Sequence, residues 1–248
     1  MQRLWFVVPA HGRVEMARVC LRQLRRTCDA LAEMNLEASA VVIADDANIE
    51  TARELGFATV RRDNRFLSQK FNDGIQLACD PEYNPRPANF VVPCGSDDWV
   101  DPRIFRMLPT ENAVVCFKYA AFVDETGQTI TAREVDYDAG VGIRIYTAKT
   151  MSRLDFRPAD EDRERACDTS IYVNLRRAFR PAVGPTVVYR DVHGYQIVDW
   201  KSSDEQLNPY SDIMARFRRG ARSEDPFVAL KGVYPDEALD EMRAVYGR

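Results

Sequence analysis

Two adjacent aspartates, Asp97 and Asp98, are the residues of this sequence best placed to do chemistry. They follow the apolar run 90–93 and the short polar turn 94–96. Two carboxylates held close together repel each other, so a site that keeps both ionised usually supplies a cation. Mg²⁺ or Mn²⁺ suits such a site, because these hard ions accept carboxylate oxygens and bridge to a diphosphate. The local alternative is a helix cap or an Asx turn ahead of Pro102.

Two other polar clusters also follow apolar runs directly. His11 and Arg13 come after the run 4–10, and Asp45 with Asp46 comes after the run 40–44. A carboxylate accepts hydrogen bonds from the N–H and O–H groups of a ligand, which makes the second cluster a candidate binding site. Capping of a helix that starts shortly after Asp46 is its alternative role.

The elements around these clusters alternate between strands and helices. This alternation predicts a parallel sheet covered on both faces. Ligands of such sheets gather at the carboxyl ends of the strands, so the three polar clusters are expected to line one crevice. Strands are predicted at 4–9, 40–44, 57–60 and 89–93, and helices at 14–31, 49–55 and 66–79.

The regular alternation ends beyond Pro102, and the sheet is expected to become mixed. Residues 113–123 predict paired strands, 124–127 a hairpin turn and 186–189 a further strand. Helical patterns cover 147–154, 169–179, 213–219 and 236–246. We expect a catalytic domain over 1–205, divided into a nucleotide-binding half (1–105) and an acceptor half (106–205), followed by a C-terminal helical extension (206–248).

The order and spacing of the segments 6–10, 41–46, 64–78 and 96–98 resemble the family 2 GT-A glycosyltransferases, over roughly residues 3–105. The resemblance implies a Rossmann-like, mostly parallel sheet flanked by helices. It also implies a nucleotide-diphosphate sugar as donor, with Mn²⁺ or Mg²⁺ as cofactor. The family's metal motif is commonly written DxD, and Ser96 stands at its first position here.

The resemblance also implies which residues meet the donor and the metal. The nucleoside would be held by Pro9, Ala10 and either Asp45 or Asp46, whose carboxylates can accept from a base N–H and from ribose hydroxyls. Asp98 corresponds to the metal ligand, and His193 is a candidate for completing the coordination sphere. The local alternatives are a solvated helix face for Lys70 and a packing role for either histidine. The donor-binding residues implied are Pro9, Ala10, His11, Arg13, Asp45, Asp46, Arg65, Lys70, Asn72, Ser96, Asp97 and Lys201.

An inverting member of this family removes the acceptor's proton with a late carboxylate at the start of a helix, which here corresponds to Asp168. Asp160, Glu161 and Asp162 are rivals in the adjoining loop, and simple N-capping is the alternative role of Asp168. Trp99, directly after the aspartate pair, is a candidate for stacking on a sugar.

Three functions remain open from the sequence. The first is an inverting glycosyltransferase that uses a nucleotide sugar, with a UDP-sugar favoured. A nucleotidyltransferase ranks lower, since that class usually has a Gly-rich loop after its first strand and the segment 9–13 contains one glycine. The third is a non-catalytic protein that binds a sugar nucleotide. The acceptors that remain open are proteins, glycans, lipid-linked sugars and, less favoured, a modified DNA base.

Composition narrows the partners. The chain has 34 basic and 38 acidic residues and a formal charge of −4, which disfavours nucleic acid. Its six cysteines show no CxxC pair, which indicates free thiols rather than zinc ligands. Apolar runs fall short of the roughly 20 residues that a membrane span needs. The N-terminal segment has no secretory pattern, so we expect a cytoplasmic protein without a membrane span.

Overall fold

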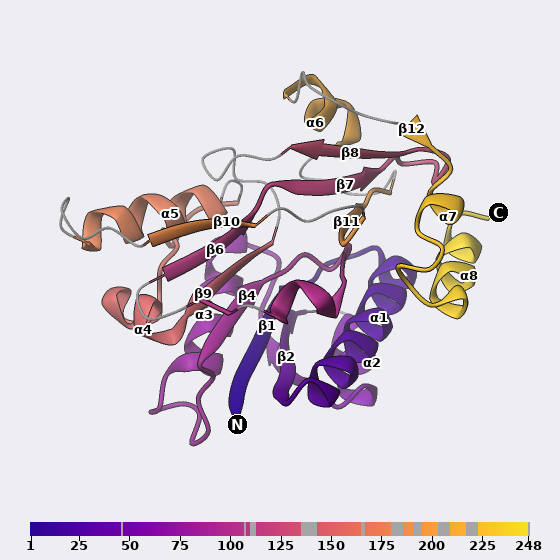
Figure 1. Cartoon of the computed structure of the whole chain (residues 1–248). Helices are drawn as coiled ribbons and strands as arrows, with labels where there is room; N and C mark the ends of the chain where they lie inside the picture. The colour runs from indigo at the N-terminus through magenta and orange to yellow at the C-terminus, as the bar shows by residue number, and fades with distance from the viewer. Residues whose placement is uncertain are drawn as a thin grey trace.

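A seven-stranded sheet forms the centre of the molecule (Figure 1). The computed structural model describes residues 1–45, 47–106, 108–109, 113–134, 143–164, 167–179, 186–190, 195–202, 209–216 and 223–247. Of residues 168, 169, 186–190, 216 and 223 it describes the backbone alone. The strand order of the central sheet is β10 (Thr186–Arg190), β6 (Ala113–Phe117), β9 (Arg144–Thr147), β4 (Phe90–Pro93), β1 (Gln2–Pro9), β2 (Leu36–Ala44) and β3 (Ala58–Arg61).

This sheet has the mixed, mostly parallel character predicted from the sequence. β9 runs antiparallel to β4 and β6, and every other neighbouring pair is parallel. The half built from β3, β2, β1 and β4 has the strand order of a Rossmann-type nucleotide-binding unit. The predicted fold class, a mostly parallel sheet flanked by helices, is therefore confirmed.

Helices cover both faces of the sheet because side chains alternate along each strand. Leu4, Phe6 and Val8 pack toward α1 (Val14–Glu33) and α2 (Asn48–Glu54). Val7 packs on the opposite face. The helices of that face are α3 (Leu67–Cys79), α4 (Ala148–Met151) and α5 (Cys167–Ala178), and the segments 102–106 and 152–154 are short 3₁₀ turns.

A second sheet lies above the first and has the order β12 (Ser223–Glu224), β8 (Ile130–Glu134), β7 (Tyr119–Val123), β11 (Ile197–Trp200) and β5 (Asp98–Val100). The predicted hairpin turn at 124–127 is confirmed, since it joins β7 to β8 and Asp124 accepts hydrogen bonds from the backbone N–H of Thr126 and of Gln128.

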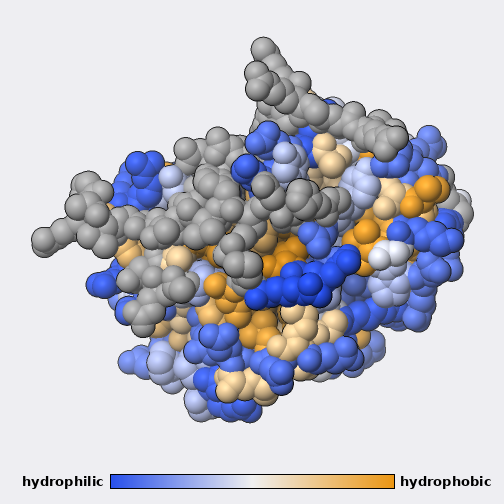
Figure 2. All heavy atoms as spheres, viewed as in Figure 1, coloured by the Kyte–Doolittle hydropathy of each residue, from blue (hydrophilic) through white to orange (hydrophobic). Residues whose placement is uncertain are grey.

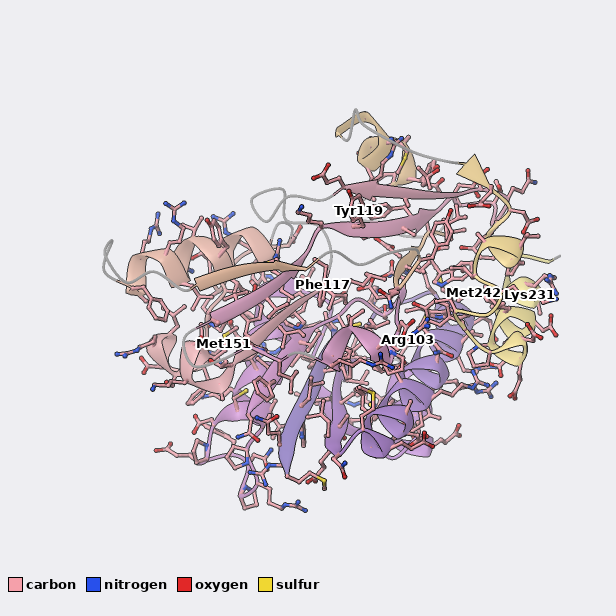
Figure 3. All side chains as sticks on the ribbon, in the orientation of Figure 1. Arg103, Phe117, Tyr119, Met151, Lys231 and Met242 are labelled. Carbon is pink, nitrogen blue, oxygen red and sulfur yellow. The ribbon has the colours of Figure 1, made fainter. Side chains whose placement is uncertain are left out.

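One sequence prediction is corrected here: residues 113–123 are not a pair of strands. β6 and β7 belong to different sheets, because the chain bends at residue 118 and each strand finds its partners elsewhere. Figure 3 labels Phe117 and Tyr119 on the two sides of this bend. β6 has five consecutive buried residues, which suits a strand covered on both faces of the central sheet. β7 instead pairs with β8 and β11 in the second sheet.

The C-terminal helices pack against the body of the molecule. α6 (Tyr210–Arg216) lies beside the second sheet, and α8 (Asp236–Val245) lies against α1. α7 (Pro226–Ala229) contributes Phe227, whose ring packs on that of Trp200. Met242, labelled in Figure 3, is buried in a cluster that includes side chains of α1. The predicted boundary at residue 205 falls outside the described residues, so the division into domain and extension stays a prediction.

Two further sequence predictions can be compared with the structure. All six cysteines are buried free thiols, as expected. Among the helices that the structure describes, none has both the length and the apolar character needed to cross a bilayer. On the face seen in Figure 2, hydrophilic residues cover much of the described surface, and apolar residues gather near its middle.

Gly74 tests the close packing of α3 on the sheet. A Cβ atom at this position would lie 2.4 Å from Val7 Cγ1 and 2.7 Å from Ile43 Cδ1. We expect Gly74→Ala to lower the free energy of unfolding by about 1–3 kcal/mol, because overpacking outweighs the gain in helix propensity. Denaturant unfolding followed by circular dichroism measures this. Glu54→Ala on the exposed side of α2 is the control, and equal stability of the two variants would contradict the prediction.

Candidate active site

The strand ends bring the polar clusters together as the sequence predicted. β4, β1 and β2 are neighbours, so the loops that follow them leave the same edge of the sheet. The loop after β4 leads into β5, which pairs antiparallel with β11. In this pairing Asp98 lies opposite Asp199, a residue about 100 positions later in the chain.

Three carboxylates meet at this edge. One oxygen each of Asp97, Asp98 and Asp199 lies within 4.8 Å of the other two. Each carboxylate also has one oxygen held by a donor. Arg13 Nη1 donates to Asp97 at 2.6 Å, and the Gly95 backbone N–H donates to Asp98 at 2.6 Å. Lys201 Nζ lies 2.6 Å from Asp199 Oδ2. Two cationic side chains thus face three acidic ones.

The pKa values of the three carboxyl groups reflect their burial and the charges around them. Burial and the charges of Asp199 and Asp97 raise the pKa of Asp98 well above its usual range. Burial, together with the charge of Asp97, raises the pKa of Asp199 to about 6, even though Lys201 acts in the opposite direction. Burial would also raise the pKa of Asp97, but the charges of Arg13 and Lys201 outweigh it and lower that pKa.

The cluster fits a divalent cation. Asp199 Oδ1 is buried and has no hydrogen-bond partner among the described residues, which is costly for a carboxylate oxygen. A hard cation bound by the three carboxylates would satisfy this oxygen and offset the repulsion. The atoms that would bind the ion are all carboxylate oxygens, which suit Mg²⁺ or Mn²⁺, the ions predicted from the sequence.

Asp199 is the member of this site that sequence reasoning missed. β11 has only four residues, and its acidic third position interrupts the apolar run, so no strand was predicted there. The available signal was Lys201, which the resemblance implies as a donor-binding residue. A carboxylate two residues before a candidate lysine was a reason to examine that segment for metal ligands.

Gly95 shapes the aspartate loop. A Cβ atom on this residue would lie 2.5 Å from Asp97 Oδ1 and 2.9 Å from Asp98 Oδ2. The absence of a side chain therefore lets both carboxylates fold back over the Gly95 backbone, whose N–H binds Asp98. Ser96 Oγ is 3.5 Å from Arg13 Nη2, so the serine at the first motif position faces the arginine.

The predicted nucleoside cluster lies at the ends of β1 and β2. His11 Nδ1 is 3.2 Å from Asp45 Oδ1, and both side chains are partly exposed. The hydrogen bond from His11 and the charge of Lys70 lower the pKa of Asp45 against the effect of burial. Lys70 is almost fully buried, and its Nζ donates to the carbonyl of Ala10 at 2.9 Å. Lys70 thus supports the loop from within α3.

The other residues predicted to bind the sugar-nucleotide donor have different surroundings. Asn72 uses its amide for the backbone of Ala159, accepting from its N–H at 2.9 Å and donating to its carbonyl at 2.8 Å. The guanidinium of exposed Arg65 lies over the ring of Phe66. Pro9 is the last residue of β1, and Asp46 lies outside the described residues. The donor-binding roles of these residues stay predictions.

The candidates for the acceptor side are only partly described. The backbone of Asp168 lies in the first turn of α5, and the structure does not describe its side chain. His193 lies outside the described residues. Two of the rival acids have basic partners, since Asp160 accepts from Arg163 at 2.6 Å and Glu161 from Arg157 at 2.8 Å.

An aromatic cluster packs behind the carboxylates. Trp99 is 1% exposed and packs against Trp200 and Tyr234, with ring centroids 5.0 Å apart in both pairs. It is therefore a core residue, and the expectation that it stacks on a sugar is corrected. Tyr246 packs on Trp200 and donates its hydroxyl to the carbonyl of Lys201. The C-terminal segment thus supports the strand that carries Asp199.

A separate cavity of about 850 Å³ opens at the opposite edge of the sheet, where β1, β2 and β4 begin. Its lining includes Leu36, Phe90 and Phe105, with Arg106 and Lys149 as the charged residues. No carboxylate lines it among the described residues, so it offers no counterpart to the aspartate cluster.

No protein-family model matches the sequence, and no curated protein matches it. Similar solved structures include a mutant of Drosophila beta-1,4-galactosyltransferase 7 in complex with manganese, UDP-Gal and xylobiose. It is 11% identical, with a TM-score of 0.47 over 76% of this chain and 65% of that chain. This chain thus spans just under two thirds of the length of that protein.

Two further solved structures are similar to this chain in fold. Glucosyl-3-phosphoglycerate synthase from Mycobacterium tuberculosis, with Mg²⁺ and uridine diphosphate, is 10% identical, with a TM-score of 0.49 over 77% of this chain and 70% of that chain. The inositol-1-phosphate CTP transferase from T. maritima is 12% identical, with a TM-score of 0.45 over 83% and 92%. We therefore base the function on the residues of the site.

Gly95→Ala tests the aspartate loop. Because the new methyl group would displace both carboxylates, we expect the dissociation constant for Mn²⁺ to rise by at least roughly tenfold, which corresponds to about 1.4 kcal/mol. Isothermal titration calorimetry on the folded variant measures it. The control is Gly232→Ala, where a Cβ atom would meet nothing within 4 Å but the left-handed backbone (φ 79°) strains the substitution, so it controls for a loss of stability away from the carboxylates. Unchanged Mn²⁺ affinity in Gly95→Ala would show that the loop does not hold the metal.

Proposed function

We propose that this protein transfers a sugar from a nucleotide-diphosphate donor, with a UDP-sugar favoured, to an acceptor hydroxyl with inversion at the anomeric carbon. One observation carries the proposal. Asp97, Asp98 and Asp199 converge with Arg13 and Lys201 at the carboxyl edge of a Rossmann-type sheet. This combination suits a metal-bound diphosphate, since ligands of such sheets bind at that edge.

Each residue of the cluster has a role in this reaction. Asp98 and Asp199 would hold Mn²⁺ or Mg²⁺, and Asp97 would contact the metal or the ribose. The bound ion would neutralise charge on the diphosphate leaving group. Arg13 and Lys201 are placed to donate to phosphate oxygens, since both already lie beside the carboxylates that would hold the metal. Positive charges that are in place before bond cleavage stabilise a departing anion.

The nucleoside would lie over the ends of β1 and β2. Asp45 is partly exposed and oriented by His11, so its remaining oxygen can accept from a base or a ribose hydroxyl. Lys70 supports the adjoining carbonyl of Ala10. Pro9, Asp46, Arg65, Asn72 and Ser96 complete the donor residues that the resemblance implies.

On the acceptor side we propose Asp168 as the general base and His193 as a further metal ligand. Asp168 lies at the start of α5, as the resemblance requires. A protein or a glycan is the proposed acceptor class, and the net charge of −4 disfavours a modified DNA base.

A panel of nucleotide sugars tests the donor, with and without Mn²⁺, by thermal shift. Selective binding at about 100-fold over the dissociation constant should raise the melting temperature by roughly 5–10 °C for a domain of this size. The product then separates the two enzyme classes. A nucleoside diphosphate supports a glycosyltransferase, and pyrophosphate supports a nucleotidyltransferase. Binding without any turnover, across metals and acceptors, would support a sugar-nucleotide-binding protein instead.

Charge-neutral variants test the metal site. Asp98→Asn keeps an oxygen for the Gly95 N–H but removes one negative charge, and Asp199→Asn does the same beside Lys201. We expect each to lose the Mn²⁺-induced rise in melting temperature and to lower kcat on the order of 100-fold. Asp29→Asn, on the exposed side of α1, is the control. Metal-dependent stabilisation that survives both substitutions would refute the site.

Asp168→Asn tests the general base separately. Removing a positioned base should lower kcat by roughly 100-fold or more while donor affinity stays unchanged, because the base acts only on the acceptor. Steady-state kinetics together with donor binding by calorimetry distinguish the two effects. A variant with full kcat would transfer the role to another carboxylate, with Asp162 as the next candidate.

A further inference from the structure

Arg13 has an unusual position in the site. It precedes α1 with a left-handed backbone, at φ 42° and ψ 42°, directly after Gly12 at φ 58°. A residue with a Cβ atom rarely adopts this conformation, and it persists where surrounding contacts hold it. The conformation lets the loop after β1 turn its guanidinium toward the aspartate loop, where Nη1 meets Asp97.

The Arg13–Asp97 pair joins two loops that are 84 residues apart in sequence. Both side chains are 15% exposed, so the pair is largely shielded from water yet can still be reached by a ligand. Lys201 differs, because it pairs with Asp199 only two residues away. Arg13 thus reaches the carboxylate cluster from the loop after β1, whereas Lys201 directly follows the strand that carries Asp199.

A guanidinium on Asp97 competes with a metal ion for the same carboxylate. Arg13 Nη1 lies 2.6 Å from Asp97 Oδ2, so the guanidinium occupies one oxygen of this carboxylate. A divalent cation bound by the cluster would meet this positive charge at short range. Binding the metal therefore requires the guanidinium to share Asp97 or to leave it.

We infer that Arg13 is a built-in competitor of the metal: it holds Asp97 while the donor site is empty and moves to the donor's diphosphate when the nucleotide binds. The inference rests on the proposed function, since it takes the diphosphate as the second partner of Arg13. The planar guanidinium makes paired hydrogen bonds to carboxylates and to phosphates alike, so the diphosphate can replace the interaction that is lost.

The exchange couples metal and nucleotide binding. Without nucleotide, metal binding is weakened by the displacement of Arg13. With nucleotide, the guanidinium has a new anionic partner, and the metal gains access to Asp97. By linkage, the nucleotide must then strengthen metal binding by the same factor as the metal strengthens nucleotide binding. A metal that bridges to the diphosphate produces coupling as well, so the behaviour of metal alone is the decisive measurement.

Mn²⁺ titrations by calorimetry, with and without UDP, test the inference on wild type, Arg13→Gln, Arg13→Lys and Arg18→Gln. Arg18 is an exposed residue of α1 that pairs with Glu15 and serves as the matched control. Without UDP, we expect Arg13→Gln to bind Mn²⁺ roughly fivefold or more tightly than wild type, with Arg13→Lys in between. With UDP, the enhancement of Mn²⁺ affinity should be smaller in Arg13→Gln than in wild type.

The outcomes separate this inference from the proposed function. If folded Arg13→Gln, checked by circular dichroism, binds Mn²⁺ alone no better than wild type, Arg13 is a fixed structural counter-ion and the competition is refuted. If Arg13→Gln does not fold, Arg13→Lys decides: it keeps the charge but loses the paired hydrogen bonds, and Mn²⁺ binding no tighter than in wild type refutes the competition. If wild type binds Mn²⁺ but no UDP, the proposed function and the transfer of Arg13 to a diphosphate both fail.

Discussion

Repulsion among three carboxylates is the constraint on which the candidate site depends. At separations near 4.8 Å, each ionised pair costs about 3 kcal/mol in the partly screened environment of a protein edge. Arg13 and Lys201 offset part of this cost, and burial together with the neighbouring carboxylates still raises the pKa of Asp98 and of Asp199. A fold that keeps these acids together without a cation would sacrifice stability for no structural gain. The arrangement is therefore best understood as a cation site.

The rest of the structure keeps the carboxylates in place against this repulsion. The antiparallel pairing of β5 and β11 fixes Asp98 opposite Asp199, and the hydrogen bond from Gly95 fixes the loop. Behind them, the rings of Trp99 and Trp200 are buried together, so a shift of either strand would open the core. The C-terminal segment contributes Tyr246 to the same support. Buried aromatic residues that do not belong to the carboxylate cluster thus keep its strands in position.

Much of the first half could be predicted from sequence because its signals are local. The apolar run of β1, the amphipathic α1 and the polar turn between them lie within about 30 residues, and strand alternation then implies which loops share an edge. The partnership of Asp98 with Asp199 had no such signal, since it depends on the register of a four-residue strand. For the same reason β6 and β7 were expected to pair with each other, whereas distant segments supply their partners.

The polar side chains around the site fall into two groups according to what they bind. Lys70 and Asn72 are ordinary polar residues in sequence, yet the structure buries both and uses them to hold backbone carbonyls of other segments. Arg13 and Lys201 instead hold charged partners, and an ion pair can exchange one anion for another, whereas a buried backbone carbonyl cannot be left without a donor at low cost. The groups able to respond to a ligand are therefore those around the carboxylates, whereas Lys70 and Asn72 hold their neighbouring segments in place.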